Sequence, residues 1–259
     1  MNQTFNLNRF CKLFAKHTAD NLKTYLMYLL VLMGVLFLGM GFAAYQSGGS
    51  LPVNAQIPIF MIVYLMAGAV FTSFTFAGLG SKRKAIPILT LPASHFEKLL
   101  VGWLYSFVFY QLLIIPAFYL VVLSIHKLGE MSPIKHNDEL MNLFGEELIL
   151  YIVLYFYAAL HALCFWGSAF FNKHHYIKTA LLLFTVIGLF SWLNTEFLQL
   201  FIGDAVQQGT PFGDMNIEEN GMYTKVHLKD GPPYRYLASY AIAILMWTST
   251  FFRLKEKEV

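Results

Sequence analysis

The side chains best suited to moving a polar substrate lie inside strongly apolar stretches of this chain. Gln111 and His161 fall near the centres of two such stretches, and Tyr155 and Tyr157 lie within two helical turns of His161. At that depth in a membrane, a polar group faces the interior of a helix bundle or a water-filled cavity. These four residues are candidates for a translocation path. The alternative, which we favour, is that they only make hydrogen bonds between helices.

Motifs for catalysis or nucleotide binding are missing from the sequence. The segment 78–82, GLGSK, approaches a phosphate-binding loop but lacks the glycine directly before lysine. Neither H-E-x-x-H nor G-x-S-x-G occurs. The adjacent His174 and His175 have no carboxylate or cysteine close in sequence, so we favour a solvated loop over a metal site. We expect no catalytic residue, metal or cofactor on this chain. An intramembrane enzyme that uses His161 is kept as an alternative hypothesis that no motif supports.

Composition predicts that these residues belong to a membrane protein. Hydrophobic residues make up 57% of the chain and charged residues 13%, whereas a soluble domain carries about 25% charge. The mean hydropathy is +0.55. Two cysteines are too few for a disulfide framework. The net charge of +3, without a basic patch on a soluble face, predicts no nucleic-acid partner.

Six apolar segments are long enough to cross a bilayer, whose core of about 30 Å needs about 20 helical residues. They lie near residues 25–45, 57–79, 98–125, 148–170, 179–200 and 236–252. We therefore predict an all-α polytopic membrane protein with six transmembrane helices. The expected organisation is a cytoplasmic amphipathic lead (1–24), a transmembrane domain (25–252) and a cytoplasmic tail (253–259).

The distribution of charge predicts how the chain is oriented in the membrane. With six spans, one side carries 13 basic and 4 acidic residues, and the other carries 5 basic and 11 acidic residues. Because Lys and Arg accumulate in cytoplasmic loops, both termini and the loop 80–98 should lie inside. The acidic loops 126–147 and 201–235 should then face outside.

The loop 80–98 combines a basic triplet with a short apolar segment. Ser94 and Glu97 fit the S-x-x-E capping box, which predicts the start of the third span. Pro87 suits the first turn of a helix and Pro92 ends one, which predicts a short helix over 86–91. Its apolar residues are Ile86, Ile88, Leu89 and Leu91, and the basic residues expected to anchor it at the membrane surface are Lys82, Arg83 and Lys84.

Two explanations of this short apolar helix remain open. An exposed apolar surface of this kind needs a partner to cover it. Alternatively, the helix lies on its own membrane interface, with the basic triplet facing anionic lipid.

The segment SKRKAIPILTLPASHFEKLLVGWL, the amphipathic lead, the six expected spans and the charged end FFRLKEKEV together resemble an ABC-2-type transporter permease. The resemblance covers the whole chain in layout and is sharpest in LPASHFEKLL and the tail. It implies that the loop 80–98 carries a coupling helix that docks on a separate ATP-binding subunit. The implied docking residues are Ile86, Ile88, Leu89 and Leu91, with Glu97 and Lys98 forming the elbow into the third span. The lead would correspond to the connecting helix of the family.

The resemblance also implies the partners and the location of the protein. ATP and Mg²⁺ would be bound by the partner ATPase, and a second permease subunit, identical or sister, would complete the unit. The location would be the bacterial cytoplasmic (inner) membrane, and the substrate exported is unknown. The alternative is a ligand-binding or immunity-type integral membrane protein that acts through its outer loops without an ATPase.

Overall fold

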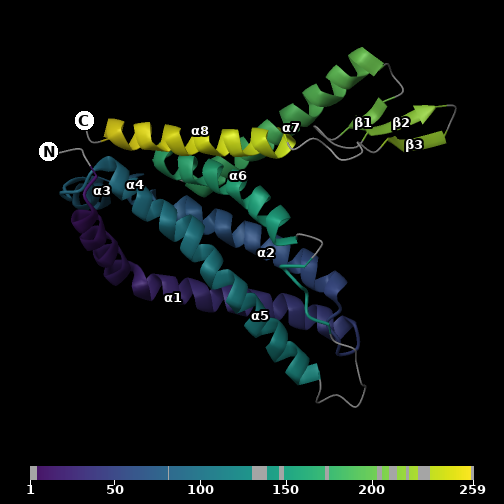
Figure 1. Ribbon diagram of the computed structural model, residues 1–259, viewed down its shortest axis with the longest axis horizontal. Coiled ribbons are helices and arrows are strands. Elements are labelled where there is room, and N and C mark those ends of the chain that lie inside the picture. The colour runs from purple at the N-terminus through teal and green to yellow at the C-terminus, as the bar shows by residue number, and fades with distance from the viewer. Residues whose placement is uncertain are drawn as a thin grey trace.

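The computed structural model describes residues 5–80, 82–129, 139–145, 149–172, 175–202, 206–209, 215–219, 222–226 and 234–257. Helices dominate the fold (Figure 1). They are α1 (Leu7–Gln46), α2 (Val53–Phe74), α3 (Lys82–Leu89), α4 (His95–Trp103), α5 (Tyr110–Gly129), α6 (Ile149–Phe170), α7 (His175–Ile202) and α8 (Tyr234–Lys257). A 3-10 turn, η1 (Ala77–Gly80), precedes α3, and a π-helical turn, η2 (Leu104–Phe109), joins α4 to α5.

Five helices in the described part of the chain are long and apolar enough to cross a membrane. They run over Leu7–Gln46, Val53–Phe74, His95–Gly129, Leu150–Phe170 and Tyr176–Leu200, where the third combines α4, η2 and α5. The fold is therefore that of a helical protein compatible with integration in a membrane. Helix α8 is not among the five, so the sixth span stays a prediction.

Helix α1 joins the expected lead and the first span into one helix of 40 residues. Asn6 caps its start, because its Oδ1 accepts a hydrogen bond from the Arg9 backbone N at 3.2 Å. At 1.5 Å per residue this helix is about 60 Å long, twice the thickness of a bilayer core. A large part of α1 must therefore extend beyond the lipid core.

The interior of the bundle is built around one face of α2. Gln56, Phe60, Tyr64, Gly68 and Thr72 follow one another at four-residue steps and are all buried. Such steps place side chains on the same face of a helix. This face packs on α6, while α1 packs along α5 and α8 packs along α6.

A second apolar cluster lies at the end of the bundle where the chain begins and ends. It joins the buried side chains of Phe76, Leu79, Ala85, Leu99 and Leu254, which come from the region of η1, from α3, from α4 and from the last turns of α8. Figure 1 shows both termini beside α3 and α4 at this end. Helix α3 is therefore attached to the bundle next to both ends of the chain.

A small antiparallel sheet lies between α7 and α8, in a region predicted only as a polar outer loop. Its strands are β1 (Val206–Gly209), β2 (Met215–Glu219) and β3 (Met222–Val226), in the order β1-β2-β3. The sequence between β2 and β3 is Asn-Gly, the strongest short hairpin signal. Figure 1 places this sheet at the end of the molecule away from α3.

Candidate functional site

Helix α3 begins earlier than the sequence predicted. It starts at Lys82 and contains Pro87 in its interior, so the predicted helix over 86–91 was wrong in its bounds. A proline inside a helix removes one backbone hydrogen bond, and the chain also accommodates one within α2 and one within α5. The chain leaves the helix at Thr90, and Leu91 lies outside it. The basic triplet Lys82, Arg83 and Lys84 therefore belongs to α3 itself and does not precede the helix.

One side of α3 packs on the bundle and another faces away from it. Ala85 is buried in the cluster with Leu79, Leu99 and Leu254. Ile86, the next residue, is 60% exposed, and Arg83 is also exposed. An apolar side chain thus projects from a helix that is attached to the bundle through Ala85. Leu91 is half-buried, and the side chains of Lys82, Lys84, Ile88 and Leu89 lie outside what the structure describes.

The capping box at the start of the third span is confirmed. The Ser94 Oγ accepts a hydrogen bond from the Glu97 backbone N at 3.2 Å, and the Ser94 backbone N donates to Glu97 Oε2 at 2.9 Å. These two bonds satisfy backbone donors that a helix start otherwise leaves unpaired. Helix α4 therefore has a fixed beginning directly after the turn that follows α3.

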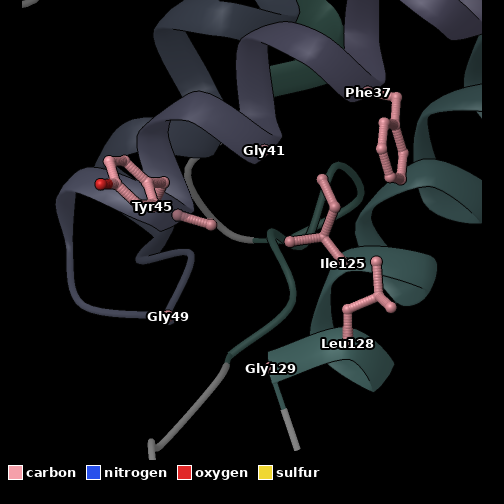
Figure 2. A pocket seen from close by; sticks show the side chains of 8 residues that line it. Phe37, Gly41, Tyr45, Gly49, Ile125, Leu128 and Gly129 are labelled. Atoms are coloured by element: carbon pink, nitrogen blue, oxygen red, sulfur yellow. The ribbon is translucent and has the colours of Figure 1, made fainter. Parts of the chain in front are cut away.

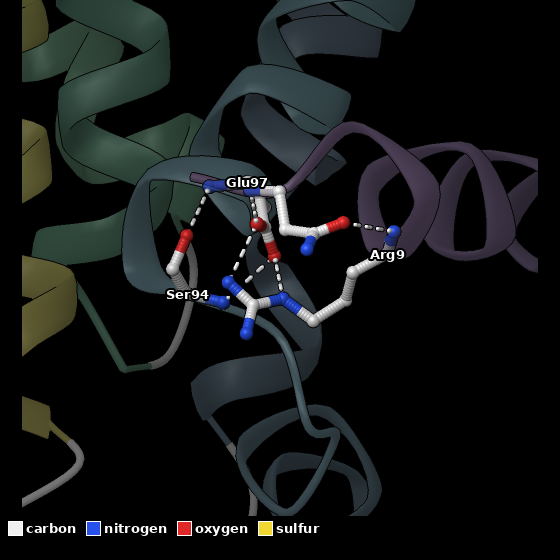
Figure 3. Close-up of polar contacts among 4 residues, drawn as sticks. Arg9, Ser94 and Glu97 are labelled. Atoms are coloured by element: carbon white, nitrogen blue, oxygen red, sulfur yellow. Dashed lines mark hydrogen bonds and ion pairs between the residues drawn. The ribbon is translucent and has the colours of Figure 1, made fainter. Parts of the chain in front are cut away.

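Glu97 also holds the start of α1, a role that the sequence did not reveal. Its Oε1 accepts hydrogen bonds from the Asn6 backbone N at 2.8 Å and from Arg9 Nη2 at 2.7 Å. Its Oε2 accepts from Arg9 Nε at 2.8 Å (Figure 3). The Glu97 side chain is fully buried, while that of Arg9 is 28% exposed. We call the group formed by Asn6, Arg9, Ser94 and Glu97 the clamp.

The clamp keeps Glu97 ionised. Glu97 lies in the first turn of the helix His95–Gly129, just before the span expected over residues 98–125, and this helix of 35 residues is longer than a lipid core of about 30 Å requires. Hydrogen bonds from the Arg9 guanidinium, helped by those from the Asn6 and Ser94 backbones, lower the pKa of the Glu97 carboxyl from 4.5 to about 2, although burial opposes this. The clamp is therefore a permanent charged joint near neutral pH.

Among the four predicted path residues, Tyr157 and His161 take part in one buried network. Trp247 Nε1 lies 3.1 Å from His161 Nδ1, and Ser106 Oγ lies 2.8 Å from His161 Nε2. Because the indole nitrogen can only donate, Nδ1 accepts and Nε2 carries the proton that is donated to Ser106. The Ser106 hydroxyl then donates to the Gly102 carbonyl at 2.8 Å.

Tyr157 extends this network to the π-helical turn. Its hydroxyl donates to the Ser106 carbonyl at 2.6 Å, so the network joins α6 to η2 through Ser106 and to α8 through Trp247. Each polar group of the His161 ring has a partner, and His161 and Ser106 are fully buried. This geometry supports the interpretation that these side chains hold helices together.

Gln111 and Tyr155 lie apart from this network. Tyr155 is half-buried, and its ring packs edge-on against Tyr240 with centroids 5.8 Å apart. Gln111 is half-buried, and its Nε2 has no hydrogen-bond partner within the described ranges. Of the four predicted residues, the structure brings Tyr157 and His161 together, with ring centroids 5.7 Å apart.

A pocket of about 310 Å³ opens between the last turns of α1 and α5, away from the clamp. Its lining is apolar apart from the phenol of Tyr45, and it includes Phe37, Ile125 and Leu128 (Figure 2). No lining residue carries a charge at neutral pH. In the described part of the chain, no three His, Cys, Asp or Glu side chains are grouped to hold a metal ion.

Comparisons of the chain with protein-family models, curated proteins and solved structures find no match.

Proposed function

We propose that this chain is the membrane-spanning permease subunit of an ABC-2-type exporter that uses ATP hydrolysed on a separate subunit. The observation that carries the proposal is the arrangement of α3. This helix presents Ile86 away from the bundle, packs Ala85 into it, and lies directly before the capped start of the third span. An exposed apolar residue on a seated helix is suited to binding a protein partner.

In this proposal α8 is the sixth span, and both termini and α3 lie on the cytoplasmic side of a bacterial inner membrane. The excess of basic residues on that side supports the orientation. A second permease subunit, identical or sister, completes the membrane part. ATP and Mg²⁺ are bound by the ATPase, which fits the missing phosphate-binding loop in this sequence.

The clamp gives the proposal a mechanical basis. Closure of the ATPases around ATP would displace α3, and Ala85 would pass that displacement to the cluster that contains Leu99 and Leu254. Glu97 would carry it to α1 through Arg9. ATP binding would thus favour one of two arrangements of the bundle, as a population shift.

The test is a pull-down in gentle detergent from native membranes, with partners identified by mass. Ile86→Asp places a charge at the centre of the proposed contact, and Leu89→Asp/Leu91→Asp extends the test to the neighbouring apolar positions. Phe144→Asp is the matched control, because Phe144 is 73% exposed and its neighbour Leu143 packs in the main core cluster rather than in the cluster that holds α3. We expect a P-loop ATPase with the wild type and with the control, and its loss from the α3 variants.

Two results would contradict the proposal in different ways. If Ile86→Asp and Leu89→Asp/Leu91→Asp both retain the ATPase, the docking assignment is wrong. If no ATPase accompanies the wild type under any mild condition, the exporter itself is wrong.

The sheet β1-β2-β3 favours a second candidate, a ligand-binding or immunity-type membrane protein that needs no ATPase. Three paired strands give the segment after α7 a defined surface beyond the helices. Deleting residues 205–230 tests this candidate. Loss of a co-purifying outer ligand from the deleted protein, without loss of any ATPase, would favour it over the exporter.

A further inference from the structure

A short non-helical segment is folded into the end of the bundle away from α3. In this segment, residues 139–145, Met141 is 1% exposed and Leu143 is fully buried, while Leu140 and Phe144 on either side of this pair are exposed. Both buried side chains belong to the main core cluster, together with Phe60 and Tyr64 of α2. We call residues 139–145 the plug.

Two side chains from neighbouring helices hold the plug, and both bind its backbone. Gln56 Nε2 donates to the Glu139 carbonyl at 2.7 Å, and Gln56 Oε1 accepts from the Met141 backbone N at 3.0 Å. The Tyr119 hydroxyl donates to the Met141 carbonyl at 3.1 Å and accepts from the Leu143 backbone N at 3.3 Å. The Leu150 backbone N of α6 also donates to the Leu143 carbonyl at 3.2 Å. Together with the burial of Met141 and Leu143, these few bonds hold the plug, so it can be released as a unit.

Gln56 is specialised for this role. It is fully buried, and its remaining amide hydrogen bonds to the Leu51 carbonyl at 2.8 Å. Its amide therefore makes three hydrogen bonds, of which two tie the start of α2 to the plug. Buried backbone groups that lose such a partner must find water or another partner.

A polar group without a partner lies deeper on the same face of α2. Tyr64 is fully buried two turns beyond Gln56, and its hydroxyl has no hydrogen-bond partner among the residues that the structure describes. Buried polar groups are nearly always paired in folded proteins. An arrangement that admits water or a polar solute to this face of α2 would give Tyr64 the partner that it lacks here.

We propose that the plug is a gate, latched by Gln56 and Tyr119, and that its release opens the buried face of α2 as far as Tyr64. The role of this gate in moving a substrate rests on the proposed exporter function. The latch itself depends only on the contacts of the plug. Lifting the plug exposes Met141 and Leu143 and leaves the helices in place, as in local opening of a native protein.

The experiment measures how fast engineered cysteines react with a membrane-impermeant maleimide. Met141→Cys reports on the plug and Tyr64→Cys on the face beneath it, each in a Cys11→Ser background. Native Cys164 is buried in α6 and is retained, because its protection shows that the bundle is still folded. Phe144→Cys, at an exposed position, gives the rate for an unprotected thiol.

We expect Gln56→Leu to raise the labelling rate of both reporters at least tenfold, which corresponds to about 1.4 kcal/mol in the opening equilibrium. Tyr119→Phe removes only a hydroxyl and should give a smaller increase. Asn54→Leu is the matched control, since Asn54 is an exposed amide on the first turn of α2 and should change neither rate.

The outcomes separate the gate from the exporter. Unchanged protection of both reporters in Gln56→Leu and Tyr119→Phe would overturn the gate, as would reaction of Met141→Cys at the rate of Phe144→Cys in the latched protein. Faster labelling in Gln56→Leu with Cys164 protected supports the gate.

Adding ATP and Mg²⁺ to the complex with its ATPase should also accelerate labelling. If labelling is faster in Gln56→Leu but is not accelerated by ATP, the gate is supported and the exporter function is contradicted.

Discussion

Arg9 and Glu97, 88 residues apart in the sequence, are joined by two nearly parallel hydrogen bonds. Nε reaches Oε2 at 2.8 Å and Nη2 reaches Oε1 at 2.7 Å. A bidentate pair of this kind fixes direction as well as distance. The first turn of α1 therefore keeps its orientation relative to the first turn of α4, next to the proposed docking helix.

Replacing Glu97 by Gln should destabilise the protein although the side chain keeps its size. An NH₂ group in place of Oε2 would face two donors, the Arg9 Nε and the Ser94 backbone N. Losing hydrogen bonds to a buried charged group costs about 1.5–3 kcal/mol. We expect the free energy of unfolding in detergent to fall by that amount, as measured by denaturant titration.

Glu256→Gln provides the control for this variant. Glu256 pairs with Arg253 at 2.6 Å but its side chain is 63% exposed. Exposed pairs contribute little, so this change should leave stability within about 0.5 kcal/mol. Equal effects of the two variants would show that the clamp adds nothing beyond surface charge.

The low pKa of Glu97 predicts a specific dependence of stability on pH. Because the pKa falls from 4.5 to about 2 on folding, the unfolded chain binds the proton more tightly. The contribution of Glu97 is complete above the unfolded value and is lost as pH falls through the folded value. The difference in unfolding temperature between wild type and Glu97→Gln should therefore be constant near neutral pH and shrink between pH 4.5 and 2. A difference that persists at the acidic end would contradict the assignment.

Local patterns predicted part of this site, and contacts between distant segments account for the rest. Ser94 and Glu97 are three residues apart, so their capping box follows from spacing alone. The partner Arg9 comes from another helix, and nothing in its local sequence separates it from the other basic residues of the lead. Gln56 was missed in the same way, because its partner in the plug lies 85 residues further along the chain.

The polar residues predicted at the centres of the spans illustrate the same limit. Depth in an apolar stretch correctly predicted that His161 is buried among helices. It could not predict that Trp247 and Ser106 satisfy both ring nitrogens, because these come from α8 and from a π-helical turn that no pattern indicated. In a π-helical turn each hydrogen bond spans five residues instead of four, which interrupts the helical period on which the prediction relies.

Ser106→Ala should be costly because it leaves the His161 Nε2 without its partner. A buried donor left unpaired costs about 1–3 kcal/mol. Ser124→Ala is a matched control on the same span, since its hydroxyl also bonds to the carbonyl four residues earlier but is exposed. Unfolding in detergent should show a loss for Ser106→Ala and little change for Ser124→Ala. If His161 served only a substrate path and did not hold helices together, both variants would be as stable as the wild type.

Gly68 permits close packing of α2 against Tyr157 and Tyr110. A Cβ at this position would lie 2.3 Å from Tyr157 Cε2 and 2.9 Å from Tyr110 Cε1. Gly68→Ala therefore forces Tyr157 to move, which strains the hydrogen bond from its hydroxyl to Ser106. Overpacking of a core typically costs about 1–3 kcal/mol, and we expect a loss of that size in the free energy of unfolding. Gly41→Ala is the control, because nothing lies within 4 Å of a Cβ there and alanine favours helix by up to about 1 kcal/mol. If Gly68→Ala were as stable as Gly41→Ala, the packing of α2 on Tyr157 would be looser than the structure describes.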